Sequence, residues 1–378
     1  MDFNFSDEQQ QLRETLSGFI KRAYGFAKRR EILESPAGFS REVWRQLADL
    51  GVLSVGIPEA HGGGGGGAVD ILAVMEVLGR GLVVEPYLPT VVLGAGLVVR
   101  AGSEAQRQRV LPGVVAGEQL LAFAHDEPGS RYELGHVNAR ARAEGDVFVL
   151  DGHKTVVLGG AEAHTLIVSA RTQGAADDHN GITLFLVDAG ARGVARRGYR
   201  NHDGQRGCEV TLEGVRVPAD AILGRAGAGL ALVEEAVDHA LAALCAEALG
   251  IMTALLTLTG DYVKTRRQFG VPIGSFQVVQ HRMADMLMRV EQARSMAYLA
   301  AATVEQGDAV ARRRVLSAAK ALVGQAARFV GQQAVQLHGG IGVTDDAIVS
   351  HYFKRLTTID LTFGDADHHL ARFSDLRT

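Results

Sequence analysis

Three long helical stretches in the C-terminal part of the chain constrain its fold more than any other feature. Residues 231–264, 277–305 and 309–337 are rich in Ala, Leu and Met. Helices that are apolar over a broad face bury that face against one another, as they do in a bundle. We therefore predict a four-helix bundle over residues 226–378.

The first 118 residues are also predicted to be helical. Ser6 followed by Gln9 is a capping-box signature for a helix start. Apolar residues then recur at helical spacing in two sets, Leu12, Leu16, Phe19 and Ile20, and Trp44, Leu47, Leu50 and Leu53. The six glycines from Gly62 to Gly67 predict a loop, because glycine is costly in a helix. The alternative, a phosphate-binding loop, lacks the Lys and Ser/Thr that should follow.

Residues 119–225 are predicted to form strands. Val147–Leu150 precedes an expected turn at Asp151–Gly152, and 166–168 and 182–187 are β-branched, apolar runs. The order helix, sheet, helix lacks βαβ alternation and therefore disfavours a Rossmann fold. The predicted fold is α+β and mostly α, with domains at 1–118, 119–225 and 226–378. The middle domain is expected to be a β-barrel or sandwich.

Composition excludes several functional classes for this 378-residue chain. A formal net charge of -4 gives no basic field that would favour a nucleic-acid or membrane partner. The two cysteines, Cys208 and Cys245, lie in unrelated contexts, so neither a disulfide framework nor a metal site is expected. Met1–Phe5 has no leader composition. We expect a soluble, cytoplasmic protein.

Six short motifs, in order along nearly the whole chain, resemble those of the acyl-CoA dehydrogenases. The N-terminal ones lie at Met1–Phe3 with Ser6–Gln9, and at Pro58–Gly63. The segments that enter and leave the strand-rich zone, Leu111–Pro112 with Gly117–Glu118 and Val217–Asp220 with Leu223–Gly224, are also similar. The two most distinctive motifs are Arg266–Gly270 and Gln336–Gly342.

The resemblance implies that FAD binds across a subunit interface, with one subunit's β domain holding the flavin ring and its neighbour's C-terminal domain holding the diphosphate and adenosine. Arg266 would donate to phosphate oxygens, and Gly339 and Gly340 would let the backbone approach the diphosphate. Phe269 would supply an apolar surface. Gln277 and Gln336 would bind polar edges of the nucleotide. The alternative is a surface ion pair for Arg266 and a helix C-cap for the glycines.

The residues that perform the family's chemistry are replaced. Dehydrogenation needs a carboxylate that removes the substrate's α-proton. Phe363 and Ala240 stand at the two positions where the family places that base. Asp238 remains beside Ala240 as a candidate contact to CoA, and Asp365 is a weak candidate for a relocated base.

The predicted flavin-ring side is altered as well. Phe123, His125 and Asp126 stand at the edge of the family's Thr-Glu-Pro-Gly run, with Asp in place of Thr. The usual Trp-x-Thr is replaced by Val156–Leu158, so that Leu158 offers no hydrogen-bond donor.

Six carboxylates and histidines have other functional or structural interpretations. Asp360 is a second candidate base if the loop register differs, whereas Glu247 is expected to be a helix-face carboxylate with a basic partner. His368 and His369 with neighbouring aspartates suggest a metal site only superficially, and a solvated helix start is favoured. His125 with Asp126 is either a proton-transfer pair or, as we favour, a satisfied histidine.

We therefore interpret the chain as the non-catalytic, FAD-completing subunit of a heteromeric acyl-CoA dehydrogenase. It looks most like the small subunit of the pimeloyl-CoA type. The partner would be a catalytic subunit in a heterotetramer, with an acyl-CoA substrate and an electron-transferring flavoprotein as acceptor. The alternatives are a self-sufficient homodimer or homotetramer with a relocated base, and a flavin-free scaffold.

Overall fold

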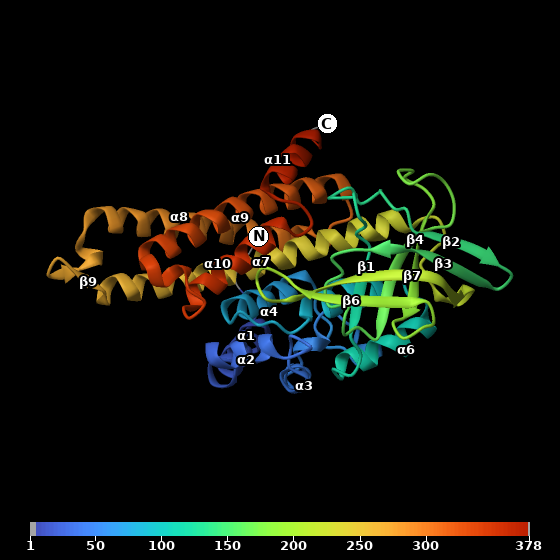
Figure 1. Cartoon of the computed structure of the whole chain (residues 1–378), viewed down its shortest axis with the longest axis horizontal. Helices are drawn as coiled ribbons and strands as arrows, with labels where there is room; N and C mark the ends of the chain where they lie inside the picture. Colours follow the sequence, from blue (N-terminus) through green and yellow to red (C-terminus); the bar gives the residue numbers. More distant parts are fainter. Residues whose placement is uncertain (1–4, 377–378) are drawn as a thin grey trace. The chain divides into compact units, whose positions relative to one another are not determined.

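The computed structural model describes residues 5–376, and the predicted order of helical, strand-rich and helical segments is confirmed (Figure 1). Met1–Phe3, part of the first family motif, lies outside the described residues. The N-terminal helices are α1 (Asp7–Ala23), α2 (Phe26–Glu34), α3 (Arg41–Asp49), α4 (Ala68–Arg80), α5 (Gly96–Ala101) and α6 (Glu104–Val115). A π-helical segment, η3 (Leu88–Ala95), precedes α5.

The strands and the C-terminal helices follow. The strands are β1 (Leu121–Ala124), β2 (Arg140–Glu144), β3 (Val147–Lys154), β4 (Thr165–Arg171), β5 (Ile182–Asp188), β6 (Val194–Arg200), β7 (Arg206–Pro218), β8 (Ile222–Leu223), β9 (Arg267–Gln268) and β10 (Val271–Pro272). The helices are α7 (Gly229–Thr265), α8 (Gln277–Thr303), α9 (Ala309–His338), α10 (Ile348–Leu361) and α11 (Ala366–Asp375). The three long helices thus begin and end within a few residues of their predicted bounds.

The chain divides into two compact units. The helical unit takes in the described residues up to Glu31, then Ala68–Val83 and the chain from Leu241 onward. The strand unit comprises Ile32–Gly67 and Val84–Ala240. The three predicted domain ranges stay a prediction. The two compact units do not follow them, because each unit contains part of residues 1–118.

Within the helical unit, α9 packs against α8, α10 and α11. Helix α1 begins with the predicted capping box, in which Ser6 and Gln9 bond reciprocally. Helices α4 and α7 approach so closely that a Cβ on Gly79 would lie 2.2 Å from the Glu247 carbonyl oxygen. The buried Glu76 carboxylate on α4 accepts a 2.8 Å hydrogen bond from Arg13 of α1.

The strand unit contains an eight-stranded sheet in the order β6-β7-β3-β2-β4-β5-β8, with β1 pairing β4. β4 runs antiparallel to β5 from Thr165 to Arg171 and parallel to β1 over Leu121–Ala124. Nearly all residues of β4 and β5 are buried, which explains their continuous apolar sequences. Outer strand β6 is largely exposed and carries arginines, which protect an edge from further pairing.

Two local predictions need correction. The expected turn at Asp151–Gly152 is not a turn, since β3 continues to Lys154 through a register shift between Leu150 and Gly152. Gly152 is needed there because a Cβ would lie 2.4 Å from the Ala139 Cβ. The second helical pattern also breaks early, because α3 ends at Asp49 and Leu53 belongs to a short 3₁₀ turn.

The glycine loop and the long helix α7 follow elementary packing rules. The predicted loop at Gly62–Gly67 is confirmed, and a Cβ on Gly63 would overlap the Ile57 carbonyl. Helix α7 is long and apolar enough to cross a membrane, but 72% of its most apolar window is buried within the protein. That degree of burial is typical of a core helix. Cys208 and Cys245 are buried, free thiols.

Candidate functional site

The six residues predicted to hold the nucleotide gather at one end of the helical unit. Arg266 directly follows α7, and Phe269 lies at the tip of the β9–β10 hairpin, which projects beyond the ends of α7 and α8 in Figure 1. Gln277 begins α8, and Gln336 and Gly339 lie at the end of α9.

Three contacts bring these segments together. The rings of Tyr262 and His338 stack with centroids 4.3 Å apart and join the ends of α7 and α9. Arg282 of α8 donates a hydrogen bond to the Gln333 side chain of α9. Phe269 meets Phe276, the residue before α8, edge to face at 6.2 Å. The candidate nucleotide site is therefore built from three helix ends and one hairpin.

Within residues 5–376, the polar side chains of this site point to solvent and make no internal hydrogen bonds. The Phe269 side chain is 92% exposed although its backbone has φ 53°, in the left-handed region. No hydrogen bond or ion pair engages the Arg266, Gln277 or Gln336 side chains within residues 5–376. The alternative interpretation of Arg266 as one half of an ion pair therefore finds no partner among those residues. Side chains free of internal bonds are available to a ligand.

Gly339 and Gly340 leave open space above the backbone. Gly339 ends α9, and its N–H bonds to the carbonyls of Val335 and Gln336, so the C-cap interpretation holds for this residue. Its φ of 67° and ψ of -145° lie where only glycine is at ease. No atom lies within 4 Å of a Cβ built on either glycine. The bare backbone thus fits an approaching diphosphate, and packing within the unit does not require glycine at 340.

Phe363, predicted to stand at one of the two family base positions, lies in a tightly held loop. Its φ is 57°, and its carbonyl bonds to His369 Nε2 at 3.0 Å. The buried Lys320 Nζ donates to the carbonyls of Asp360 at 2.7 Å and Gly364 at 2.6 Å. Burial lowers the pKa of Lys320 to about 8. The backbone of this loop is constrained, although the Phe363 side chain cannot accept a proton.

The two aspartates proposed as rescue bases have structural partners. Asp365 caps α11 by accepting a 2.8 Å hydrogen bond from the His368 backbone. Asp360 is buried and accepts a 2.9 Å hydrogen bond from Arg328. The prediction of a solvated helix start is wrong for His369, which is fully buried. Its ring packs inside the protein, where Nε2 bonds to the Phe363 carbonyl.

Residues on α7 near the second base position are buried. Ala240 and Asp238 are both 0% exposed. Glu247 forms a two-pronged ion pair with Arg355 of α10, at 2.6 and 2.7 Å. The predicted basic partner of Glu247 is thereby confirmed.

The predicted ring-side residues lie in the strand unit around a buried polar network. Phe123 and His125 stack at 5.4 Å on β1 and the residue after it. His125 Nδ1 lies 2.9 Å from Ser169 Oγ, and Lys154 Nζ donates to Ser169 Oγ at 2.9 Å and to Glu127 at 2.7 Å.

The network and its burial keep His125 neutral. Lys154 donates to the Ser169 hydroxyl, and that hydroxyl lies within hydrogen-bond distance of His125 Nδ1. Burial and the nearby Lys154 lower the pKa of His125 to about 3, so the ring is neutral. The interpretation of a satisfied histidine agrees with this geometry.

Unlike Glu127, which pairs with Lys154, Asp126 forms no ion pair with any residue in the range 5–376. Burial raises its pKa to about 6, against the opposing charge of Lys154. Val156, where the resemblance predicts tryptophan, has φ 51° and a half-exposed side chain. Leu158 follows two residues later and offers no donor. Strained β-branched backbone of this kind concentrates at binding sites.

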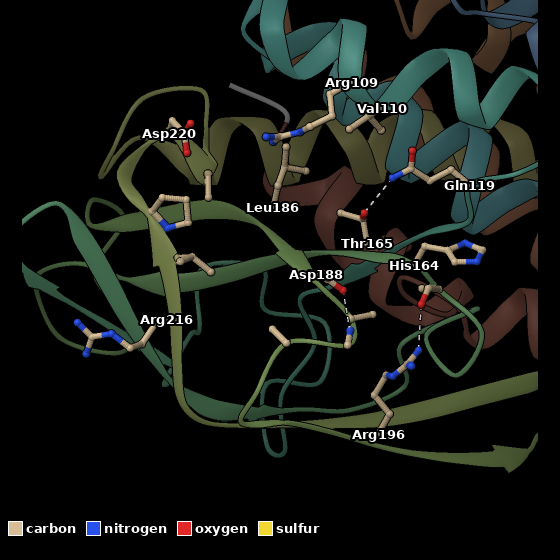
Figure 2. A pocket seen from close by; sticks show the side chains of 17 residues that line it. Arg109, Val110, Gln119, His164, Thr165, Leu186, Asp188, Arg196, Arg216 and Asp220 are labelled. Carbon is tan, nitrogen blue, oxygen red and sulfur yellow. Dashed lines mark hydrogen bonds between the residues drawn. The ribbon is translucent and has the colours of Figure 1, made fainter.

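A cavity of about 590 Å³ lies elsewhere in the strand unit, and none of the predicted site residues lines it (Figure 2). Leu186, Val217 and Pro218 are among its apolar lining, and Arg109 of α6 extends over it. Asp188 at the end of β5 accepts a hydrogen bond from the Gly190 backbone. No pattern in the sequence indicates this cavity, because its lining comes from six separate segments.

The sequence also failed to single out Tyr262, Lys320 and Lys154. A buried lysine in an apolar helical stretch, as Lys320 is, could have been noticed, since lysine is almost never fully buried without a partner.

Family models match nearly the whole chain. They describe the acyl-CoA dehydrogenase N-terminal domain at residues 6–118, the middle domain at 122–215 and the C-terminal domain at 227–373. A mitochondrial isovaleryl-CoA dehydrogenase from Pongo abelii is 31% identical over 370 residues, covering 96% of this chain and 86% of that protein.

Two solved structures with the same fold are complexes of two different chains. A variant of the Tcur3481-Tcur3483 steroid ACAD matches with a TM-score of 0.88 at 32% identity, covering 98% of this chain and 97% of that one. The ChsE4-ChsE5 complex from Mycobacterium tuberculosis matches with a TM-score of 0.89 at 31% identity, covering 99% and 98%.

Proposed function

Because the chain is a member of the acyl-CoA dehydrogenase family of FAD-dependent oxidoreductases, we propose that it completes the FAD site of a catalytic partner subunit. In this role it does not itself remove the substrate proton. FAD, when bound, supplies the acceptor for the hydride that leaves the acyl-CoA. The residues of this chain bind and orient the nucleotide half of that cofactor.

One observation carries the proposal: the nucleotide-facing groups are intact and available, whereas both base positions are apolar. Arg266 and Gln336 are exposed and free of internal bonds, and Gly340 is bare over open space. Arginine presents fixed donors to two phosphate oxygens at once, and backbone N–H groups add further donors. Phe363 and Ala240 have no group that could accept a proton.

The carboxylates near these positions support a non-catalytic role. Asp365 is engaged as a helix cap, and Glu247 is bound by Arg355 at both oxygens. A carboxylate held in a short two-pronged ion pair is a poor base, because protonating it would break its ion pair with a buried arginine. Asp360, Asp365 and Glu247, the carboxylates that could serve a self-sufficient enzyme as its base, therefore all have structural partners.

The ring-side residues fit a flavin ring poorly. Leu158 cannot donate a hydrogen bond, and an ionised Asp126 would oppose the negative charge that a reduced ring gains. A heteromer in which the catalytic partner supplies the ring-holding domain removes this conflict. The Tcur3481-Tcur3483 and ChsE4-ChsE5 proteins are examples of two-chain assemblies among similar structures.

The test is FAD retention by the complex formed on co-expression with a catalytic subunit. Arg266→Ala should strip FAD from the complex, because the variant removes the phosphate donor. Arg45→Ala is the matched control, since Arg45 is an exposed arginine of α3. Equal FAD content in both variants and the wild type would refute the proposal. Apparent molecular mass, measured alongside, verifies that both complexes assemble.

Three finer expectations remain predictions. From the resemblance, the chain is expected to be most like the small subunit of the pimeloyl-CoA type, and the electron acceptor is expected to be an electron-transferring flavoprotein. From composition, the location is expected to be cytoplasmic. Turnover of a series of acyl-CoA thioesters by the assembled complex would identify the acyl group.

A further inference from the structure

The candidate nucleotide site joins two segments that are far apart in the sequence. The hairpin with Arg266 and Phe269 follows α7, and the loop with Gly339 and Gly340 follows α9. A ligand bound by both segments needs them in a fixed relation, because misplaced donors lose much of their value. Neither segment can fix its own position relative to the other. A contact between the ends of α7 and α9 is therefore needed to hold the hairpin and the loop in place.

Tyr262, in the last turn of α7, makes that contact. Its ring stacks on His338 with the planes inclined by 25°, and its hydroxyl donates to the His338 carbonyl at 3.3 Å. That carbonyl belongs to the peptide that leads into Gly339. The Tyr262 carbonyl, in turn, accepts a 2.8 Å hydrogen bond from the Arg266 backbone N–H. One residue is thus bonded to the start of both segments.

His338 is itself held firmly in place. Its Nδ1 lies 2.8 Å from the Ala334 carbonyl, which can only accept, so Nδ1 carries the proton. The following loop folds back on the same residue, since a Cβ on Gly342 would lie 3.1 Å from the His338 Cβ. The other segment is tied at its base, where the Ile273 N–H bonds to the Arg266 carbonyl at 2.8 Å. Both segments are therefore fixed at their bases, and the Tyr262–His338 pair joins those bases.

We propose that Tyr262 and His338 are positioning residues that set the spacing between Arg266 and Gly339 and so govern how tightly the nucleotide half of FAD is held. This inference rests on the proposed function. Neither residue needs to touch the cofactor, because each acts through the segment that it holds.

The experiment measures the rate of FAD loss from the assembled complex by the rise in flavin fluorescence after dilution. Tyr262→Phe keeps the stacked ring and removes only the hydroxyl. We expect FAD to dissociate about threefold to tenfold faster, because the variant loses one hydrogen bond that holds the two segments in position. Tyr262→Leu also removes the stack and should accelerate the loss further.

Tyr352→Phe is the matched control. Tyr352 is a second tyrosine of the helical unit whose hydroxyl donates to a backbone carbonyl, that of Arg80, at 2.6 Å. Both phenylalanine variants should lower thermal stability by similar amounts, but only Tyr262→Phe should change FAD dissociation. A role that is merely structural would move the two readouts together in both variants.

Two outcomes overturn the proposal, and they can be told apart. If Arg266→Ala strips FAD while Tyr262→Phe and Tyr262→Leu both retain it as the wild type does, the positioning role is refuted and the proposed function survives. If Arg266→Ala also leaves FAD unchanged, the nucleotide site itself is refuted, and the positioning role with it.

Discussion

Replacing Glu247 with Gln is expected to destabilise the protein strongly without revealing a catalytic function. The carboxylate and the Arg355 guanidinium are both buried, and two bonds of 2.6 and 2.7 Å join them. The amide of glutamine cannot neutralise the guanidinium, so the variant leaves a buried positive charge. Breaking a buried pair in this way costs about 3–5 kcal/mol.

The corresponding shift in melting temperature follows from the unfolding entropy. At about 2.1 cal/mol/K per residue, a chain of this length unfolds with about 0.8 kcal/mol/K. A loss of about 4 kcal/mol therefore lowers Tm by about 5 °C if the whole chain unfolds together. Scanning calorimetry at pH 7 on the chain with and without its partner would measure the shift.

Two controls sharpen this test. Glu291→Gln removes an exposed carboxylate that pairs with Arg294 on α8, and it should change Tm by less than about 1 °C. The double variant Glu247→Leu with Arg355→Met removes both charges and should recover most of the loss. The reasoning fails if Glu247→Gln is no more harmful than Glu291→Gln, or if the double variant is worse than the single one.

Three further substitutions have signed outcomes. Asp126→Asn should raise Tm at pH 8 and leave it unchanged at pH 4, because burial raises the pKa of Asp126 to about 6 and ionising it in the folded state costs up to about 3 kcal/mol. Glu127→Gln should remove the loss of stability below about pH 4.5, since Lys154 and backbone hydrogen bonds outweigh burial and lower the pKa of Glu127; a melting curve at each pH checks both. Gly339→Ala should cost about 1–3 kcal/mol of backbone strain and release FAD, as calorimetry and flavin absorbance would record.

The elements that sequence reasoning located well are those governed by local chemistry. The capping box at Ser6 and the broad apolar faces of 231–264 and 309–337 depend on neighbours in the chain, so their boundaries could be predicted. Gly152 shows the opposite case. It resembled a turn residue, but the reason for glycine is its close approach to Ala139, the residue before strand β2.

The candidate site was predictable in its parts and not in its assembly. The family resemblance placed Arg266 and Gly339 by motif, and the structure locates both at one end of the helical unit. The Tyr262–His338 stack could not be predicted, because it joins helix ends 76 residues apart. The burial of His369 could not be predicted for a similar reason. Its partner is the backbone carbonyl of Phe363, and every residue has such a carbonyl, so no sequence pattern indicates the contact.

Constrained backbone marks three of the positions singled out by sequence. Val156, Phe269 and Phe363 all have positive φ although none is glycine, Asn or Asp. Such strain persists where the surroundings enforce it, and it concentrates at binding sites.

The central claim is that this chain lends a nucleotide-binding half-site to a partner and has no working site of its own. The most direct test is the molar ratio of FAD to protein. It is obtained by releasing the flavin with acid and measuring its absorbance, for the chain purified alone and for the chain purified with its catalytic subunit. The account predicts a flavin-poor chain alone and one FAD for every pair of unlike chains in the complex. A homo-oligomer of this chain that carries one FAD per chain and is bleached by an acyl-CoA would contradict it.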